Sequence, residues 1–217
     1  MKAASLFILQ ANIPESFSLT NETYTETQIV NNVEERLVTQ LFINEDTVNG
    51  YQHCSIVADE IIDVRARALQ QYLTQIIIQN KYDAYFNKTT GSLVVLSGKK
   101  IADRVKDIFR TKFNLQYEKH EFNMEEIINN ASNVRGARFK DLTIETIRNG
   151  VLTGNRVDQT ELYELMLNNG TLYNTTVKYL FGVTEVTFSV SNNGSIVLFS
   201  NLDDIQYLDL LDELKNL

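Results

Sequence analysis

The sequence predicts an α+β protein made of two related halves, each with antiparallel strands, a β-hairpin and packing helices. Three observations lead to this prediction. The chain has 217 residues, 43% hydrophobic and 22% charged, which is typical of a globular protein with a sizeable core. Residues 85–98 (YFNKTTGSLVVLSG) are similar to residues 188–201 (FSVSNNGSIVLFSN). Each of these two segments runs into a stretch whose apolar residues recur at helical spacing.

Each of the two similar segments predicts a tight hairpin. Gly91 and Gly194 follow short polar residues, and glycine readily supplies the positive φ that such a turn needs. The strand after each turn is continuously apolar, which predicts a central strand with Val95 or Val197 in the core. We therefore expect the two hairpin–helix units to be structural repeats.

The other elements of the first half follow from apolar spacing. A first strand is predicted from Ala3 to Leu9, where six of the seven residues are apolar. A helix from about Asp63 to about Asn80 is predicted because its apolar residues fall at i, i+3, i+4 and i+7. A second helix, near residues 101–109, follows the hairpin.

The second half is predicted to contain four helices. Met124 to Ala131 forms a short connecting helix, with Asn123 as its N-cap. A helix near residues 162–166 ends before Gly170, and a further short helix covers Leu172 to Phe181. The terminal helix follows the second hairpin and has two aspartates in its first turn, where they oppose the helix dipole.

The doubled unit resembles the TATA-binding-protein fold, whose two repeats each contain strands, a hairpin with a glycine turn and a closing helix. The residues that carry the resemblance are YFNKTTGSLVVLSGKK and FSVSNNGSIVLFSN, about a quarter of the chain with the helices that follow. The resemblance implies the fold of the repeat. In that family the concave sheet binds the minor groove of DNA, but no functional residue is carried over to this sequence.

The charge pattern divides the chain more clearly than its net charge of −8 does. Residues 15–63 hold ten acids and one base, residues 64–156 hold nine acids and sixteen bases, and residues 157–217 hold nine acids and two bases. We place the boundary between the halves at residue 120, so that residues 1–120 and 121–217 form two α+β domains. The segregated charge indicates either contacts with protein or a basic middle that binds nucleic acid.

Composition also predicts the compartment and the cofactor content. A single cysteine excludes a disulfide framework and cysteine-based metal clusters, and two histidines leave few options for metal ligation. The sequence has no apolar run of about 18 residues, and its N-terminus lacks a convincing export signal. We therefore predict a cytoplasmic protein with no membrane association, no metal and no cofactor.

Known catalytic motifs do not fit this sequence. The segment GSLVVLSGKK has six residues between its glycines where a phosphate loop needs four. His53 and Cys54 are neighbours on a predicted strand and should point to opposite faces, so they do not form a nucleophile–base pair. The Glu-Leu-Lys triplet at residue 213 has nuclease-like spacing but lies on a predicted helix, and the acids at residues 59, 60 and 63 fit a helix start and surface charge.

Two basic groups remain as candidate contact sites. Around residues 99–112 the bases alternate with Asp103 and Asp107, which predicts a salt-bridged surface helix in which these acids pair with Lys99, Lys100 and Arg104. Residues 134–156 are less compensated, with five bases against two acids. The candidate contacts for a phosphate or an acidic partner are therefore Arg135, Arg138, Lys140, Arg148 and Arg156.

These observations predict a non-enzymatic protein-interaction subunit or regulator that acts through segregated acidic and basic surfaces. Protein partners or self-association follow from this prediction. Two alternatives stay open: a nucleic-acid-binding protein that uses the basic middle, and a hydrolase or nuclease whose acids converge only in three dimensions. The overall acidity disfavours nucleic acid, because the acidic flanks repel a polyanion.

Overall fold

The computed structural model describes residues 2–9, 13–14, 17–68 and 71–217, and it shows that the predicted fold class is wrong. The protein is mostly antiparallel β-sheet, with 55% strand and 21% helix. The chain forms two compact units, one of residues 9–117 and one that joins residues 1–8 to residues 118–217. We refer to them as unit 2 and unit 1 respectively, and each is described by itself.

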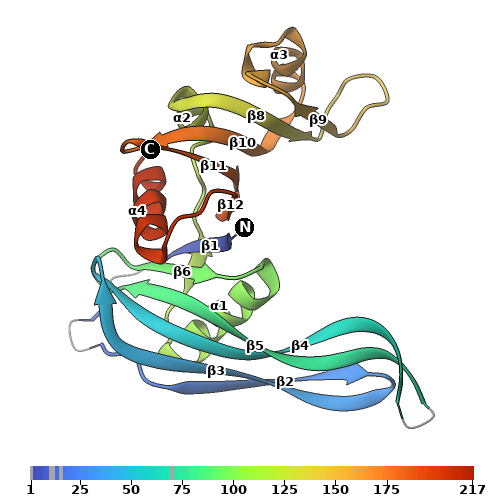
Figure 1. Cartoon of the computed structure of the whole chain (residues 1–217), viewed down its shortest axis with the longest axis vertical. Helices are drawn as coiled ribbons and strands as arrows, with labels where there is room; N and C mark the ends of the chain where they lie inside the picture. The colour runs from blue at the N-terminus through green and yellow to red at the C-terminus, as the bar shows by residue number, and fades with distance from the viewer. Residues whose placement is uncertain (1, 10–12, 15–16, 69–70) are drawn as a thin grey trace. The chain divides into compact units, whose positions relative to one another are not determined.

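Unit 2 is an antiparallel sheet of five strands with one helix (Figure 1). Its strands lie in the order β2-β3-β4-β5-β6, so each strand pairs with its neighbour in sequence. The elements are β2 (Glu22–Val30), β3 (Val33–Val48), β4 (Tyr51–Ala68), β5 (Gln71–Asn87), β6 (Ser92–Leu96) and α1 (Lys99–Phe113).

The core of unit 2 lies between α1 and the sheet. Phe109 of α1 is fully buried, and its ring contacts the rings of Phe86, Phe113 and Tyr117 at centroid distances of 5.4–5.8 Å. Arg104 also lies on the buried face of α1 and forms an ion pair with Glu26 of β2. Aromatic packing and this ion pair together fix α1 on the sheet.

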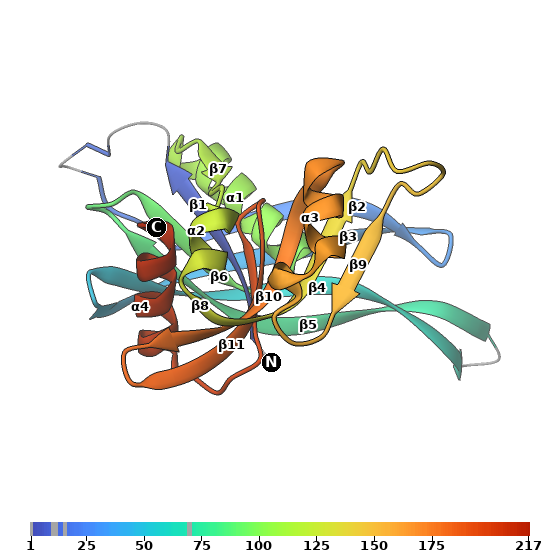
Figure 2. The same ribbon diagram turned by 90° about the horizontal axis from the view of Figure 1, so that it is seen from above.

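The helix expected at residues 63–80 is a strand pair instead. β4 and β5 cover residues 63–68 and 71–80 of this segment, while residues 69 and 70 lie outside the described residues. Ile61 and Ile62 lie opposite Ile77 and Ile76. β-Branched side chains have one strongly preferred χ1 rotamer in a helix and pack well in cross-strand pairs. Both views show the β4–β5 pair extending past α1 (Figures 1 and 2), and no described side chain between residues 60 and 79 is fully buried. The sheet therefore leaves both faces of this pair open to solvent.

Unit 1 is also mostly antiparallel β-structure, and its described residues include three helices. Its strands lie in the order β1-β12-β11-β10-β8-β9, and β7 also pairs with β1. The strands are β1 (Lys2–Leu9), β7 (Tyr117–Lys119), β8 (Ala131–Lys140), β9 (Gly150–Thr153), β10 (Thr171–Phe181), β11 (Thr184–Ser191) and β12 (Ser195–Leu198). The helices are α2 (Met124–Asn129), α3 (Glu161–Asn168) and α4 (Asp204–Lys215), with a 3₁₀ turn η1 (Val157–Gln159) before α3.

The helix expected from Leu172 to Phe181 is also wrong, because this segment is β10. Thr175, Val177 and Tyr179 are buried at every second position, which is the period of a strand. Thr175 donates its hydroxyl to the carbonyl of Gly136 in β8 at 2.9 Å. Because Thr175 is polar, the sequence of β10 does not show the regular alternation of apolar and polar residues that predicts a strand. The hydrogen bond of its hydroxyl explains how it is accommodated on the buried face.

Several local predictions are confirmed. The strand at the N-terminus, both hairpins and the helices after them are present, and Gly91 and Gly194 have φ of 64° and 77°. The Asn123 side chain caps α2 by accepting a hydrogen bond from the amide of Glu126. α4 begins with a capping box formed by Asp203 and Gln206. The hairpin–helix order is thus the same in both units, while the resemblance to the TATA-binding-protein repeat stays a prediction.

The two valines expected in the core differ in burial, and this difference predicts unequal effects of truncation. The side chain of Val95 is fully buried, whereas that of Val197 is only half-buried. Val95→Ala should lower the free energy of unfolding by about 1–3 kcal/mol through lost burial and a cavity. Val197→Ala should cost less than about 1 kcal/mol. Urea unfolding of both variants checks the prediction, and equal losses would contradict it.

Candidate functional site

All five predicted basic residues lie exposed in unit 1, on or next to β8. We call them the basic strand surface: Arg135, Arg138, Lys140, Arg148 and Arg156. Three of them belong to β8 itself. Arg148 lies in the loop between β8 and β9, and Arg156 precedes η1.

The alternation of β8 places its basic side chains away from the core. Val134, Ala137 and Phe139 are buried, whereas Arg138 and Lys140 are exposed. Arg138 lies opposite Val151 of β9 and Asn174 of β10, with Val151 also exposed. At about 3.3 Å per residue, the span from Arg135 to Lys140 is about 16 Å.

The loop after β9 brings Arg156 next to the start of β8. The Arg135 guanidinium donates to Oδ1 of Asn155 at 2.6 Å, and the amide of Gly154 donates to the carbonyl of Arg135 at 3.0 Å. The amide of Arg156 in turn donates to Oδ1 of Asn133 at 3.0 Å. Two arginines that are distant in sequence are therefore held together at one end of the surface.

Arg148 is held differently from the other four residues. Its guanidinium donates to the carbonyl oxygens of Leu142 and Glu145 at 3.2 and 3.3 Å. These bonds close the loop between β8 and β9, so this arginine partly serves the structure of its own loop.

The basic strand surface has little internal charge compensation. In the part of the chain that the structure describes, no carboxylate forms an ion pair with Arg135, Arg138, Arg148 or Arg156. Lys140 has a single carboxylate nearby, that of Asp141 at 3.9 Å. The acids of unit 1 lie mostly on α2, α3, α4 and the residues that precede them, whereas the bases lie mostly on strands.

In the second basic group, the predicted pairing of Arg104 along its own helix is wrong. Arg104 is buried and binds Glu26 at 2.5 Å, not Asp103 or Asp107. Arg110 does pair with Asp107 at 2.9 Å along the helix. Lys112 also pairs with Glu22 of β2 at 3.8 Å. α1 therefore uses at least two of its bases to bind its own sheet, and the buried Arg104 is removed from any external contact.

The residues considered for catalysis do not assemble into a reactive group. His53 binds Oδ1 of Asp83 at 2.7 Å through Nε2 and the side chain of Asn44 at 2.8 Å through Nδ1. Cys54 is fully buried, and burial raises the pKa of its thiol to about 12. A thiol held protonated in this way is a poor nucleophile at neutral pH.

The acids at residues 59, 60 and 63 do not start a helix but lie on β4. Asp59 accepts a hydrogen bond from the amide of Val38, and Glu60 accepts one from the side chain of Asn80. Within the described ranges, no three histidine, cysteine, aspartate or glutamate side chains gather closely enough to hold a metal ion. No described helix is long and apolar enough to cross a membrane.

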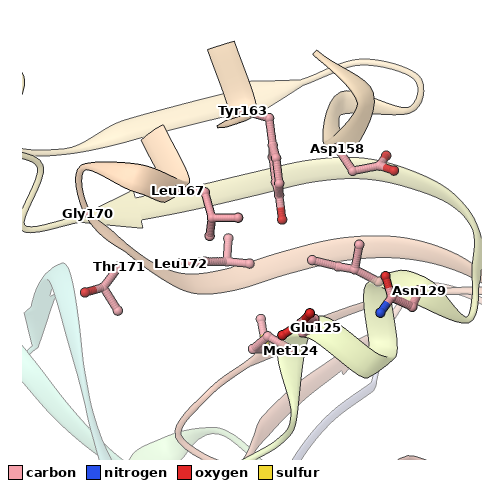
Figure 3. Close-up of a pocket in the computed structure, with 10 residues that line it drawn as sticks. Met124, Glu125, Asn129, Asp158, Tyr163, Leu167, Gly170, Thr171 and Leu172 are labelled. Atoms are coloured by element: carbon pink, nitrogen blue, oxygen red, sulfur yellow. The ribbon is translucent and has the colours of Figure 1, made fainter. Parts of the chain in front are cut away.

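Sequence reasoning missed a pocket of about 580 Å³ on the helix-bearing face of unit 1 (Figure 3). Tyr163 of α3 points into it, with its ring against Phe139 of β8 at a centroid distance of 5.4 Å. Its other lining residues come from α2, η1, α3, β10 and the turn before β10: Met124, Glu125, Ile128, Asn129, Asp158, Leu167, Gly170, Thr171 and Leu172. No local motif signals this pocket, because it requires elements from across a span of about fifty residues.

The electrostatics of the pocket are those of an acidic site. Burial raises the pKa of Tyr163, and the charges of Asp158 and Glu125 raise it further. Oδ1 of Asp158 is buried and has no hydrogen-bond partner among the described residues. The lining contains no lysine, arginine or histidine.

Comparison with known proteins adds no assignment to either site. No protein-family model matches this sequence, and no curated protein is significantly similar to it.

Proposed function

We propose that this protein is a non-enzymatic interaction subunit that binds an acidic segment of a partner protein through the basic strand surface. The observation that supports the proposal most directly is that four exposed arginines on or next to β8 have no carboxylate partner in the described chain. Arginine binds carboxylates through two parallel hydrogen bonds, which gives both attraction and a fixed geometry.

The size of the surface favours a short acidic peptide segment over nucleic acid. A span of about 16 Å matches about five residues of an extended chain. Unit 1 carries nine bases and fifteen acids, so a long polyanion that extends beyond the surface meets a net negative charge. A short acidic segment contacts the bases without that repulsion.

Charge reversal on β8 tests the proposal. The double variant Arg135→Glu with Arg138→Glu should bind a fluorescent glutamate-rich peptide at least tenfold more weakly than the wild type. We expect the wild-type affinity to fall as salt rises, because the contact is electrostatic. Fluorescence anisotropy across a salt series measures both effects, with duplex DNA and single-stranded RNA as competing ligands.

The chain offers a control of equal charge change. Lys99→Glu with Lys100→Glu reverses two exposed lysines at the start of α1, in the other unit. This control should keep wild-type affinity for the peptide. An equal loss in both double variants, or tighter wild-type binding of nucleic acid than of the peptide, would overturn the proposal.

A further inference from the structure

The pocket of unit 1 contains a buried polar atom that the described protein leaves without a partner. Tyr163, Glu125 and Asp158 all line it. Oδ1 of Asp158 is buried without a hydrogen-bond partner among the described residues, whereas the side chain of Glu125 is exposed at the rim. A buried carboxylate oxygen without a partner is unusual, because its desolvation is not offset. The site is therefore complementary to a donor that comes from outside the chain.

Apolar side chains form the rest of the pocket. Met124 and Ile128 of α2, Leu167 of α3 and Leu172 of β10 line it. Figure 3 shows Leu172 between Leu167 and Met124. The pocket volume of about 580 Å³ lies within the range of small-molecule sites. A pocket with apolar walls, two carboxylates and no basic residue favours a ligand that has an apolar part and a cationic group.

We infer that this pocket binds a small organic amine, with its ammonium group at Asp158 and Glu125 and its apolar body against Met124, Ile128 and Leu167. The ammonium group supplies hydrogen-bond donors to the carboxylates and offsets their charge. A carboxylate or phosphate ligand would meet two like charges in a partly buried site, which disfavours its binding. The inference is independent of the proposed function, since it uses different residues.

The raised pKa of Tyr163 is consistent with this assignment. The carboxylates that raise the pKa of its hydroxyl are the two that would bind the amine. A bound cation near them would lower the pKa of Tyr163 toward its ordinary value.

Three ligands with the same apolar group but different charges distinguish the contribution of charge to affinity from that of hydrophobic contact. We would titrate ¹⁵N-labelled protein with 4-phenylbutylamine, 4-phenylbutanol and 4-phenylbutyrate and follow amide chemical shifts. The expected order of affinity is amine, alcohol, then acid, with at least a tenfold step between the amine and the alcohol. The largest shifts should fall on α2, α3 and the start of β10.

Variants of the pocket complete the test. Glu125→Gln with Asp158→Asn should weaken binding of the amine at least tenfold and leave the alcohol within about twofold. Glu161→Gln with Glu164→Gln removes two exposed acids of α3 that do not line the pocket, and it should change neither affinity. Equal affinity for amine and alcohol, or chemical-shift changes confined to other parts of the protein, would overturn the inference.

Discussion

Replacing Arg104 with methionine should lower the free energy of unfolding of unit 2 by about 3–5 kcal/mol, the usual cost of removing one partner of a buried ion pair. Arg104 is only 6% exposed and donates to both Oε1 of Glu26 at 2.5 Å and the carbonyl of Asp59 at 2.6 Å. The variant leaves a partly buried carboxylate and a carbonyl oxygen without their donor. Methionine retains most of the aliphatic volume, so the loss reflects the missing charge and hydrogen bonds.

A second substitution distinguishes the stability lost with the ion pair from the stability lost with side-chain packing. Arg104→Met combined with Glu26→Leu removes both charges, and we expect it to recover a substantial part of the lost stability. Urea unfolding followed by circular dichroism measures each variant. A loss below about 1 kcal/mol in the single variant would show that the pair contributes no more than a surface ion pair does.

Gly194→Ala should destabilise unit 1 by about 3 kcal/mol or more, from two causes that act together. Gly194 has a φ of 77°, a left-handed conformation that costs an alanine about 1–2 kcal/mol. A Cβ atom at this position would also lie 2.7 Å from the carbonyl oxygen of Leu6 and 2.9 Å from that of His120. Both neighbours are backbone atoms held by the hydrogen bonds from Leu6 to Gly194 and from His120 to Leu6. The clash therefore cannot be relieved by rotation of a side chain.

Gly91→Ala is the matched control for this prediction. Its φ of 64° imposes a similar conformational cost, but the nearest atom to the new Cβ would be Cβ of Leu9 at 3.1 Å. We expect a smaller loss of about 1–2 kcal/mol, chiefly from backbone conformation, because the contact with Leu9 is tight but requires only a small shift. Thermal unfolding compares the two variants, and equal losses would show that the backbone around Gly194 moves aside.

The features that could be predicted from sequence are those decided by neighbouring residues. A glycine after short polar residues makes a turn wherever the flanking strands are, and Asn123 caps α2 through an amide three residues away. These interactions need no information from distant parts of the chain. The exposure of Arg138 and Lys140 was likewise foreseeable from the uncompensated charge of their segment.

The two wrong helices fail for distinct physical reasons. In the β4–β5 pair neither face is fully buried, so apolar residues such as Ile76, Ile77 and Ile78 occupy both faces and no strand alternation is visible. In β10 the polar Thr175 occupies a buried position, so the apolar residues of the strand do not alternate regularly with polar ones. In each case the deciding interaction is with a partner strand, which the local sequence does not contain. The pocket around Tyr163 was unpredictable for the same reason, because its walls come from separate elements.

The burial of Cys54 allows the unfolding of unit 2 to be followed by alkylation of this one thiol. It is the chain's single cysteine, and alkylating reagents react with the thiolate, which a pKa of about 12 keeps scarce at neutral pH. Labelling therefore has to wait until β4 opens, and its rate reports the free energy of that opening. Because unit 1 contains no cysteine, the modified fraction follows one unit without interference from the other, and mass spectrometry reads it without any engineered probe.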